Sequence, residues 1–387
     1  MAMIWRLPPA MVQKEIVNSG AHAGSFVIFQ SKSSIIPLKL SQVRTPAANI
    51  LKQEMLALGG DAVTPMSTIL GTEKYVDIIL LGTEKQYNLL WQKLAAMPFF
   101  GLEKWRGELQ GILHSKTGRI QLGNGRVLPD QKTLVMGIVN LTPDSFYAAS
   151  RMLLPGRGNI AGSDGDAVAD YVQGMIEDGA DMVDLGAEST RPGATPLSAA
   201  EEQKRLLPVL RMLREKFSDL IISVDTYHGE TARRAVEAGA DIINDVSGRD
   251  DPAIRRVVEE YGTPWVITHN GPGGILRVTE ELLARAEKLQ LPKDKLILDP
   301  GIGFGKDGED NLEILRNLSM LTCYGYPVLL GASRKSVIGR VLNLPPEERL
   351  EGTVAISVHA VKQGVNIIRV HDVRANCRAI RMAEALR

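Results

Sequence analysis

Two adjacent cations, Arg334 and Lys335, stand where an apolar run of the sequence ends. The run Pro327–Leu330 leads into the segment Gly331–Ser336, and a helical pattern follows. A short apolar run bounded by glycine and followed by a helix indicates a buried parallel strand and its βα loop. Two positive charges in such a loop need an anionic or carbonyl-bearing group opposite them. A solvated basic turn is the alternative interpretation of this segment alone.

Polar residues also follow the other apolar runs in the last two-thirds of the chain. They are Asn140, Asp184, Glu188, Asp225, Asn244, Asp245, His269, Asp299, Arg369, His371 and Asp372. Three stretches of the sequence share one pattern, in which a glycine and a short turn precede a β-branched run that ends in polar residues. They are Gly179–Gly186, Gly239–Val246 and Gly364–His371. Charged side chains at strand ends lose solvation unless they are paired or used, so the set indicates a site. For any single member, a structural salt bridge is the alternative.

The polar residues divide into two groups by their chemistry. Carboxylate and amide oxygens of Asp225, Asn244 and Asp299 suit a flat ligand with adjacent N–H groups, such as an aminopyrimidinone. Lys335 suits a ring carbonyl or nitrogen of the same ligand. A second, cationic group suits phosphate and consists of Arg191, Arg369 and His371. The residue types therefore suggest a site that joins an aminopyrimidinone to a phosphate leaving group.

Short apolar runs separated by amphipathic stretches provide the strands that position these residues. The runs are Leu134–Val139, Met182–Leu185, Leu220–Val224, Ile242–Ile243, Trp265–Ile267, Leu296–Leu298, Val328–Leu330 and Ile367–Val370. Strand–helix units repeated in this way predict an α/β fold of the TIM-barrel type, (β/α)8, in which all strands end at one face. A doubly wound open sheet is the alternative. It requires a Gly-rich phosphate loop after the first strand, and Val139–Pro143 is no such loop.

The chain is predicted to contain two domains. Residues 1–115 are predicted to form a small separate α/β domain without identifiable chemistry, and residues 116–387 the barrel domain. In the first domain we expect strands at Ser25–Gln30 and Val76–Leu81 and helices at Thr45–Leu58 and Glu84–Met97. At the start of the second, the pair Asn124-Gly125 lies between alternating apolar residues, which is the strongest short hairpin signal. We interpret this hairpin as a lid on the barrel.

Composition limits the classes of partner. The 45 Lys and Arg residues balance the 45 Asp and Glu residues, so no overall field attracts nucleic acid or a membrane surface. Small molecules or proteins are the expected partners. The two cysteines, Cys323 and Cys377, lack a metal-ligand or disulfide pattern, which favours a cytoplasmic location. No signal peptide and no membrane span are expected.

Two Gly-rich segments differ from a nucleotide-binding loop. The segment Asp299–Lys306 lacks the spacing and the Ser or Thr of a P-loop. We expect a mobile βα loop that closes over substrate, with Phe304 as an apolar wall. The segment Gly186–Gly193 similarly places Arg191 and Pro192 on a loop rather than in the core.

The barrel region resembles the dihydropteroate synthase family. The matching pieces are NLTPDSF at Asn140–Phe146, GAESTRPGA at Gly186–Ala194, SVDT at Ser223–Thr226, NDVSG at Asn244–Gly248, His269, DPGIGFGK at Asp299–Lys306, SRKS at Ser333–Ser336 and RVHDV at Arg369–Val373. The resemblance implies a transferase that condenses 6-hydroxymethyl-7,8-dihydropterin diphosphate with 4-aminobenzoate in folate biosynthesis, the step blocked by sulfonamides. It also implies a homodimer.

The resemblance further implies a role for each matching residue. Asp225, Asn244, Asp299 and Lys335 would hold the pterin, Asn140 would take part in binding Mg²⁺ and diphosphate, and Arg191, Arg369 and His371 would hold the leaving diphosphate. Thr190, Pro192, Phe146, Phe304 and Ser336 would shape the aminobenzoate pocket. The residues expected to act most directly in catalysis are Lys335, Asp225, Arg369 and His371.

Two alternative functions stay open. A methyltetrahydrofolate-corrinoid methyltransferase would share the pterin-binding barrel, but it has no diphosphate to hold with Arg369 and His371. A pterin-binding protein without catalysis is suggested by the loop after Phe146. There Tyr147-Ala148-Ala149-Ser150 replaces the Ser-Asp-Gly-Gly that is usual in the family.

Overall fold

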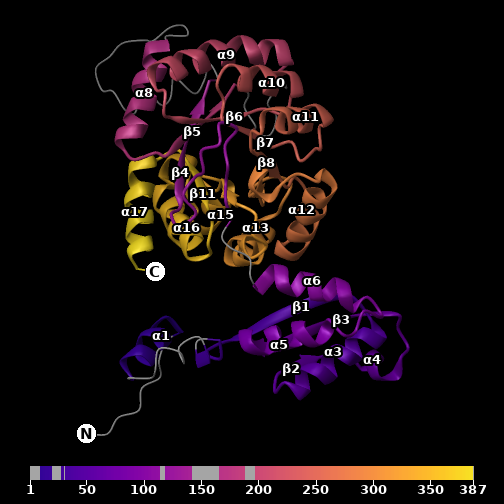
Figure 1. Ribbon diagram of the computed structural model, residues 1–387. Helices are drawn as coiled ribbons and strands as arrows, with labels where there is room; N and C mark the ends of the chain where they lie inside the picture. The colour runs from indigo at the N-terminus through magenta and orange to yellow at the C-terminus, as the bar shows by residue number, and fades with distance from the viewer. Residues whose placement is uncertain are drawn as a thin grey trace, which may run out of the picture. The chain divides into compact units, whose positions relative to one another are not determined.

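The computed structural model of the chain describes residues 9–19, 28–29, 31–113, 118–141, 165–187 and 197–386 (Figure 1). The chain divides into two compact units, Met1–Ser115 and Lys116–Arg387. Separate groups of buried apolar side chains form the core of each unit. Within the described residues, no helix combines the length and the apolar character needed to cross a membrane.

The N-terminal unit contains a small antiparallel sheet. Its described strands are β1 (Ile35–Arg44), β2 (Asp61–Val63) and β3 (Tyr75–Thr83), in the order β1-β3-β2. Its described helices are α1 (Pro9–Asn18), α3 (Thr45–Ala57), α4 (Met66–Leu70), α5 (Glu84–Leu94) and α6 (Leu102–Leu113). Burial alternates along β3, so one face of the sheet contributes Ile78 and Leu80 to a core shared with Leu51 and Leu90. A capping box between Thr83 and Gln86 begins α5.

One strand predicted in this unit is wrong in its described part. Ile28 and Phe29 are helical and half exposed, whereas the prediction placed them in a strand over Ser25–Gln30; the rest of that segment lies outside the described residues. The strands that pair with β3 are β1 and β2, and the prediction missed both. The predicted strand Val76–Leu81 and both predicted helices are observed as β3, α3 and α5.

The second unit is a closed barrel of parallel strands. Those described are β4 (Leu134–Asn140), β5 (Met182–Gly186), β6 (Ile221–Asp225), β7 (Ile242–Asp245), β8 (Trp265–Thr268), β9 (Leu296–Asp299), β10 (Leu329–Leu330) and β11 (Ile367–Val370). They form one 8-stranded sheet within the described residues, in the order β10-β11-β4-β5-β6-β7-β8-β9. A bridge between Leu298 and Val328 joins the two ends, and the Leu298 N–H donates to the Pro327 carbonyl at 2.8 Å. The predicted (β/α)8 fold is confirmed.

Helices surround this barrel (Figure 1). Those described are α8 (Gly165–Glu177), α9 (Ala199–Lys216), α10 (Gly229–Glu237), α11 (Pro252–Tyr261), α12 (Ile275–Leu289), α13 (Gly308–Arg316), α14 (Ser319–Thr322), α15 (Ser336–Leu342), α16 (Leu350–Lys362) and α17 (Val373–Ala385). Local sequence sets their ends: Asp251 caps α11, which begins with Pro252 and ends at Gly262 in the left-handed conformation. The helical segments between consecutive strands return the chain to the start of the next strand.

The Asn124-Gly125 hairpin closes the end of the barrel where the strands begin. The Leu122 N–H donates to the Arg126 carbonyl at 2.9 Å, and Gly125 takes the turn with φ +84°. Its apolar side chains pack with the first residues of the strands in one buried cluster: Ile120, Leu122, Leu128, Leu134, Met136, Met182, Ile221, Ile242, Val266, Ile297, Leu329 and Ile367. The hairpin is thus a lid on the end opposite to the polar strand ends, and it does not cover them.

Candidate active site

Asp184 lies at the centre of the polar strand ends. Its carboxylate accepts hydrogen bonds from three other strands: from Ser223 Oγ at 2.6 Å, from Asn244 Nδ2 at 2.9 Å and from Arg369 Nε at 2.6 Å. Asp184 is fully buried, so these donors replace the water that a carboxylate needs. The arrangement fixes the side chains of β6, β7 and β11 relative to β5.

Arg369 also connects Asp184 to Asp225. One guanidinium nitrogen lies 3.4 Å from Asp225 Oδ2. Burial and the Asp184 carboxylate raise the pKa of Asp225 to about 8, although Arg369 opposes the shift. Burial alone would lower the pKa of Arg369, but the carboxylates of Asp184 and Asp225 outweigh it and raise that pKa. Two carboxyl groups thus share one guanidinium in a largely buried site.

Lys335 and Asp299 form the other side of the site. Asp299 is buried and accepts the Gly301 N–H at 2.7 Å, and burial raises its pKa against the nearby charge of Lys335. The Lys335 ammonium donates to the Ile302 carbonyl and lies 4.5 Å from the centroid of the Phe304 ring. Burial lowers the pKa of Lys335 to about 8. A lysine held so close to neutrality can donate to a ligand carbonyl or nitrogen with little loss of hydration.

Two glycines leave space between these charged groups. A Cβ atom on Gly331 would lie 3.9 Å from both Arg369 Cδ and Asp299 Oδ2. One on Gly186 would lie 3.5 Å from Asp225 Cβ and 3.7 Å from Asn140 Oδ1. Because glycine has no side chain, nothing at these two positions covers the neighbouring oxygens.

Asn244 presents an acceptor into this space. Its Nδ2 is engaged by Asp184, while its buried Oδ1 has no hydrogen-bond partner among the described residues. A buried acceptor without a partner destabilises the fold by about 1–3 kcal/mol. A ligand N–H would satisfy it, which matches the acceptor role that the sequence suggests for this residue.

The turn before Lys335 is held by side chains of the two residues that connect β11 to α17. Arg334 has φ +56° and makes a bidentate pair with Asp372, with N–O distances of 2.7 and 2.8 Å. Ser333 Oγ lies 3.0 Å from His371 Nδ1. The basic pair of the sequence therefore has two uses: Arg334 fixes the turn, and Lys335 enters the site.

The described residues contain no cluster of three His, Cys, Asp or Glu side chains that could cage a metal ion. Asn140, at the end of β4, is partly buried beside Gly186. Mg²⁺ usually takes one or two protein oxygens, waters and substrate phosphates. The amide oxygen of Asn140 is one protein oxygen of the kind that this pattern requires.

Of the remaining predicted site residues, some lie in the described part of the chain and others do not. Phe304 is half-buried beside Lys335, and Ser336 is exposed at the first residue of α15. Phe146, Thr190, Arg191 and Pro192 lie outside the described residues. The prediction gave no role to Asp184 or to Lys306. Lys306 is the last residue of the DPGIGFGK motif, and the recurrent polar residue at the sixth position of the three similar segments is the signal that marks Asp184.

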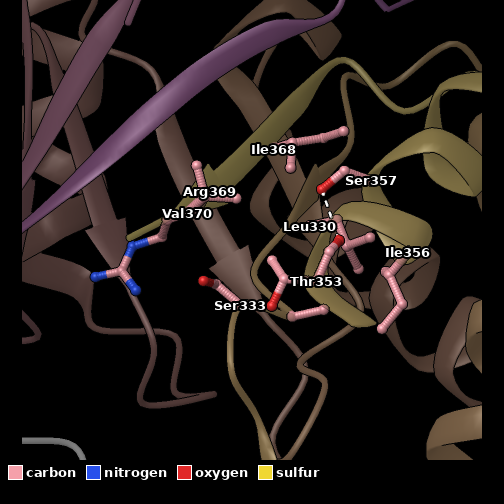
Figure 2. A pocket seen from close by; sticks show the side chains of 9 residues that line it. Leu330, Ser333, Thr353, Ile356, Ser357, Ile368, Arg369 and Val370 are labelled. Atoms are coloured by element: carbon pink, nitrogen blue, oxygen red, sulfur yellow. Dashed lines mark hydrogen bonds between the residues drawn. The ribbon is translucent and has the colours of Figure 1, made fainter. Parts of the chain in front are cut away.

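Behind the site, a small space lies between β10, β11 and α16 (Figure 2). Leu330, Ile356 and Ile368 line it, and Ser357 Oγ donates to the Thr353 carbonyl at 3.0 Å. The guanidinium of Arg369 points away from this space in Figure 2. It has no room for a water molecule, so it is a packing gap of the outer layer rather than a ligand site.

The barrel matches known proteins over most of its length. Residues 136–371 match the family of pterin binding enzymes. A dihydropteroate synthase of Clostridium beijerinckii is 40% identical over 277 residues, which are 69% of this chain and 99% of that protein. The solved dihydropteroate synthase of Xanthomonas albilineans with 4-aminobenzoic acid is 36% identical, with a TM-score of 0.63 over 70% of this chain and 98% of that chain.

The fold and the site therefore define a pterin-binding barrel enzyme, a transferase. The chain belongs to the dihydropteroate synthase family. A probable bifunctional folylpolyglutamate synthase/dihydropteroate synthase of Halobacterium salinarum is 38% identical over 367 residues. This match covers 90% of the chain and so extends into the N-terminal unit, but the chain spans only 42% of that relative.

Proposed function

We propose that this chain condenses 6-hydroxymethyl-7,8-dihydropterin diphosphate with 4-aminobenzoate to form 7,8-dihydropteroate and diphosphate. The observation that carries the proposal is the buried group at the strand ends, in which Arg369 is held by Asp184 and Asp225 while Asp299 and Lys335 stand opposite. This group offers acceptors for N–H groups of a pterin and a cation for the diphosphate end.

The acceptors suit the aminopyrimidinone edge of a pterin. Asp299 and Asp225 can each accept ring or amino N–H groups, and Asn244 Oδ1 is a further acceptor in the same space. Lys335 can donate to the ring carbonyl or a ring nitrogen. Because Asp299 and Asn244 are buried and Asp225 and Lys335 are partly buried, hydrogen bonds to the ligand form with little competition from water.

Departure of diphosphate leaves an electron-poor methylene on the pterin. Arg369, which pairs with Asp184, and His371, beside Ser333, are proposed to stabilise the charge of the leaving group. We propose that Asn140 also binds a Mg²⁺ ion, which when present neutralises diphosphate charge. The arylamine attacks the methylene directly, so no covalent protein nucleophile is needed. The low-polarity wall of Phe304 helps to keep water from the same carbon.

The aminobenzoate pocket is proposed to lie at the outer side of the site. Phe304 and Ser336 are its described members, and Phe146, Thr190, Arg191 and Pro192 are assigned by resemblance, Arg191 to the diphosphate. The relative from Xanthomonas albilineans was solved with 4-aminobenzoic acid, which supports the same second substrate here. Sulfonamides are then expected to compete with 4-aminobenzoate. By the same resemblance we propose that the protein is a cytoplasmic homodimer. Light scattering would measure the mass of the assembly.

The direct test mixes the pterin diphosphate, 4-aminobenzoate and Mg²⁺ with the purified chain. Release of diphosphate that requires both substrates is expected. Folded protein that binds the pterin without turnover would instead support a pterin-binding protein that does not catalyse. Methyl transfer from methyltetrahydrofolate to a corrinoid, without diphosphate release, would support the methyltransferase alternative.

A further inference from the structure

The loop after β9 encloses the ammonium group of Lys306. Its Nζ lies 3.0 Å from the Gly301 carbonyl, 3.1 Å from the Phe304 carbonyl, 3.2 Å from the His269 carbonyl and 3.0 Å from His269 Nδ1. The ammonium has three hydrogens, so these acceptors saturate it. No carboxylate oxygen contacts it directly among the described residues. Lys306 thus acts as an internal cation around which the main chain is wrapped.

Glycines allow the main chain to bend in this way. Gly301, Gly303 and Gly305 all have positive φ, at +68°, +82° and +66°. A Cβ atom on Gly301 would lie 1.8 Å from the His269 carbonyl oxygen, so no side chain fits there. Alternation of these glycines turns successive carbonyls in different directions.

The histidine ring is fixed from its other side. His269 is buried, and its Nε2 lies 3.0 Å from Glu281 Oε2 on α12. Burial and the Lys306 charge lower the pKa of His269, so the ring is neutral. The neutral ring then accepts from Lys306 through Nδ1 and donates to Glu281 through Nε2, a tautomer inferred from its partners.

The same loop contacts Lys335 on its opposite side. The Gly301 and Phe304 carbonyls face Lys306, whereas the intervening Ile302 carbonyl accepts from Lys335. The Phe304 ring also lies against the Lys335 ammonium. The loop is therefore held between two lysines, and only Lys335 is available to a ligand in the site.

We propose that Lys306 is a positioning residue for the reaction: through the carbonyls of its loop it sets the position of Phe304 and of Lys335 without touching substrate. This inference rests on the proposed function for its kinetic test. Loss of the ammonium would remove the described donor to the His269 carbonyl. It would leave the Gly301 and Phe304 carbonyls with one backbone N–H each, from Phe304 and Gly271, so the loop would relax away from Lys335. Pterin binding would then weaken, and the wall offered to the second substrate would move.

The chain contains a matched control at the other end of the barrel. Lys295 is also a part-buried lysine that donates to two carbonyls, to Gln121 at 2.6 Å and to Gly262 at 2.7 Å. Burial lowers its pKa, as it lowers that of Lys306 to about 8. Lys295→Ala removes the same chemistry beneath the hairpin, far along the strands from the site.

The experiment compares Lys306→Ala and Lys295→Ala in the full chain. In Lys306→Ala, we expect at least tenfold weaker pterin binding by calorimetry, a higher KM for 4-aminobenzoate and faster amide exchange over residues 299–306. Ammonium chloride, against sodium chloride at equal ionic strength, should restore part of the pterin affinity, because ammonium can occupy the carbonyl-lined space. Lys295→Ala should lower Tm without these effects.

Normal pterin affinity and loop exchange in folded Lys306→Ala would overturn the proposal, as would equal losses in Lys295→Ala. If Lys306→Ala does not fold, Glu281→Gln leaves the lysine in place and releases the His269 ring, and a smaller change of the same kind is expected. Amide exchange needs no turnover. If the wild-type chain proves inactive, the proposed function fails while the exchange measurement still decides the role of Lys306.

Discussion

Lys335 keeps a charge in surroundings that oppose it. Its pKa is lowered to about 8 by burial, and its described contacts are the Ile302 carbonyl and the Phe304 ring. Lys335→Ala is expected to weaken pterin binding at least tenfold, which corresponds to about 1.5–3 kcal/mol for a charge-assisted hydrogen bond. Calorimetry measures the affinity. Lys288→Ala, on an exposed side chain of α12, is the control, and unchanged binding in Lys335→Ala would place the lysine outside the pterin site.

Asp225 gives the protein a predicted dependence of stability on pH. Its pKa is raised to about 8 in the folded chain, against about 4 in an unfolded chain. The folded state therefore holds a proton that the unfolded state has lost over this range. Stability from this group is complete below about pH 4 and is lost as pH rises to about 8.

Asp225→Asn removes this titration and keeps the shape of the side chain. Between pH 5 and pH 8, the wild-type chain should lose about 1 kcal/mol or more of unfolding free energy relative to the variant. Urea denaturation of both proteins at the two pH values measures the difference. The same pH dependence in both proteins would mean that Asp225 is ionised throughout.

Position at a strand end was enough to predict which polar side chains gather at one face of the barrel, because parallel strands of a barrel end at one face. The role of Asp184 was not predictable in the same way. It depends on which donors three neighbouring strands bring to one carboxylate, and a sequence does not specify that geometry. The sequence likewise shows Lys306 only as a charged residue of a loop, and its contacts with the surrounding carbonyls are evident only from the structure.

Gly331 follows β10 directly, and its lack of a side chain leaves the end of this strand uncovered. Gly331→Val would place methyl groups between Arg369 and Asp299, where a Cβ already has contacts at 3.9 Å. The KM for the pterin substrate should rise at least tenfold with a small change in Tm. Gly331→Ala is the matched control, since 3.9 Å is an ordinary contact distance, and its KM should change little. A large loss of Tm in Gly331→Val would indicate a packing role instead.

The hairpin below the barrel should affect stability and not chemistry. Leu122 is 1% exposed and packs among the first residues of the strands. Leu122→Ala should lower the unfolding free energy by about 2–5 kcal/mol through loss of burial and a residual cavity. Urea denaturation measures this loss. Pterin affinity of the folded variant should equal that of the wild type, and weaker binding would show that the hairpin end of the barrel is coupled to the site.

The strands of the barrel were predictable because the pattern repeats, whereas in the N-terminal unit β3, α3 and α5 were predicted and β1 and β2 were missed. β1 contains Pro37, which argues against a central strand. The strand tolerates this proline because it lies at an edge of the sheet and pairs only with β3 among the described strands. The apolar run at Ile28 and Phe29 was mistaken for a strand because β-branched and aromatic content alone does not reveal whether a partner is present.

At the scale of the whole molecule, the chain has two units with separate cores, and every described residue of the proposed site belongs to the second. The Clostridium beijerinckii relative is matched over 99% of its length by 69% of this chain, so a barrel without the N-terminal unit exists in this family. A fragment of residues 116–387 should therefore fold and bind the pterin with an affinity within about twofold of the full chain.

Calorimetry on the fragment and on the full chain measures this affinity, and circular dichroism confirms that each protein is folded. Lys335→Ala in the fragment serves as the control and should weaken binding as much as it does in the full chain, because both contexts contain the same site. A folded fragment that has lost pterin affinity would show that the N-terminal unit contributes to the site. A fragment that keeps affinity but loses turnover would assign that unit to a later step, such as binding of the second substrate or release of product.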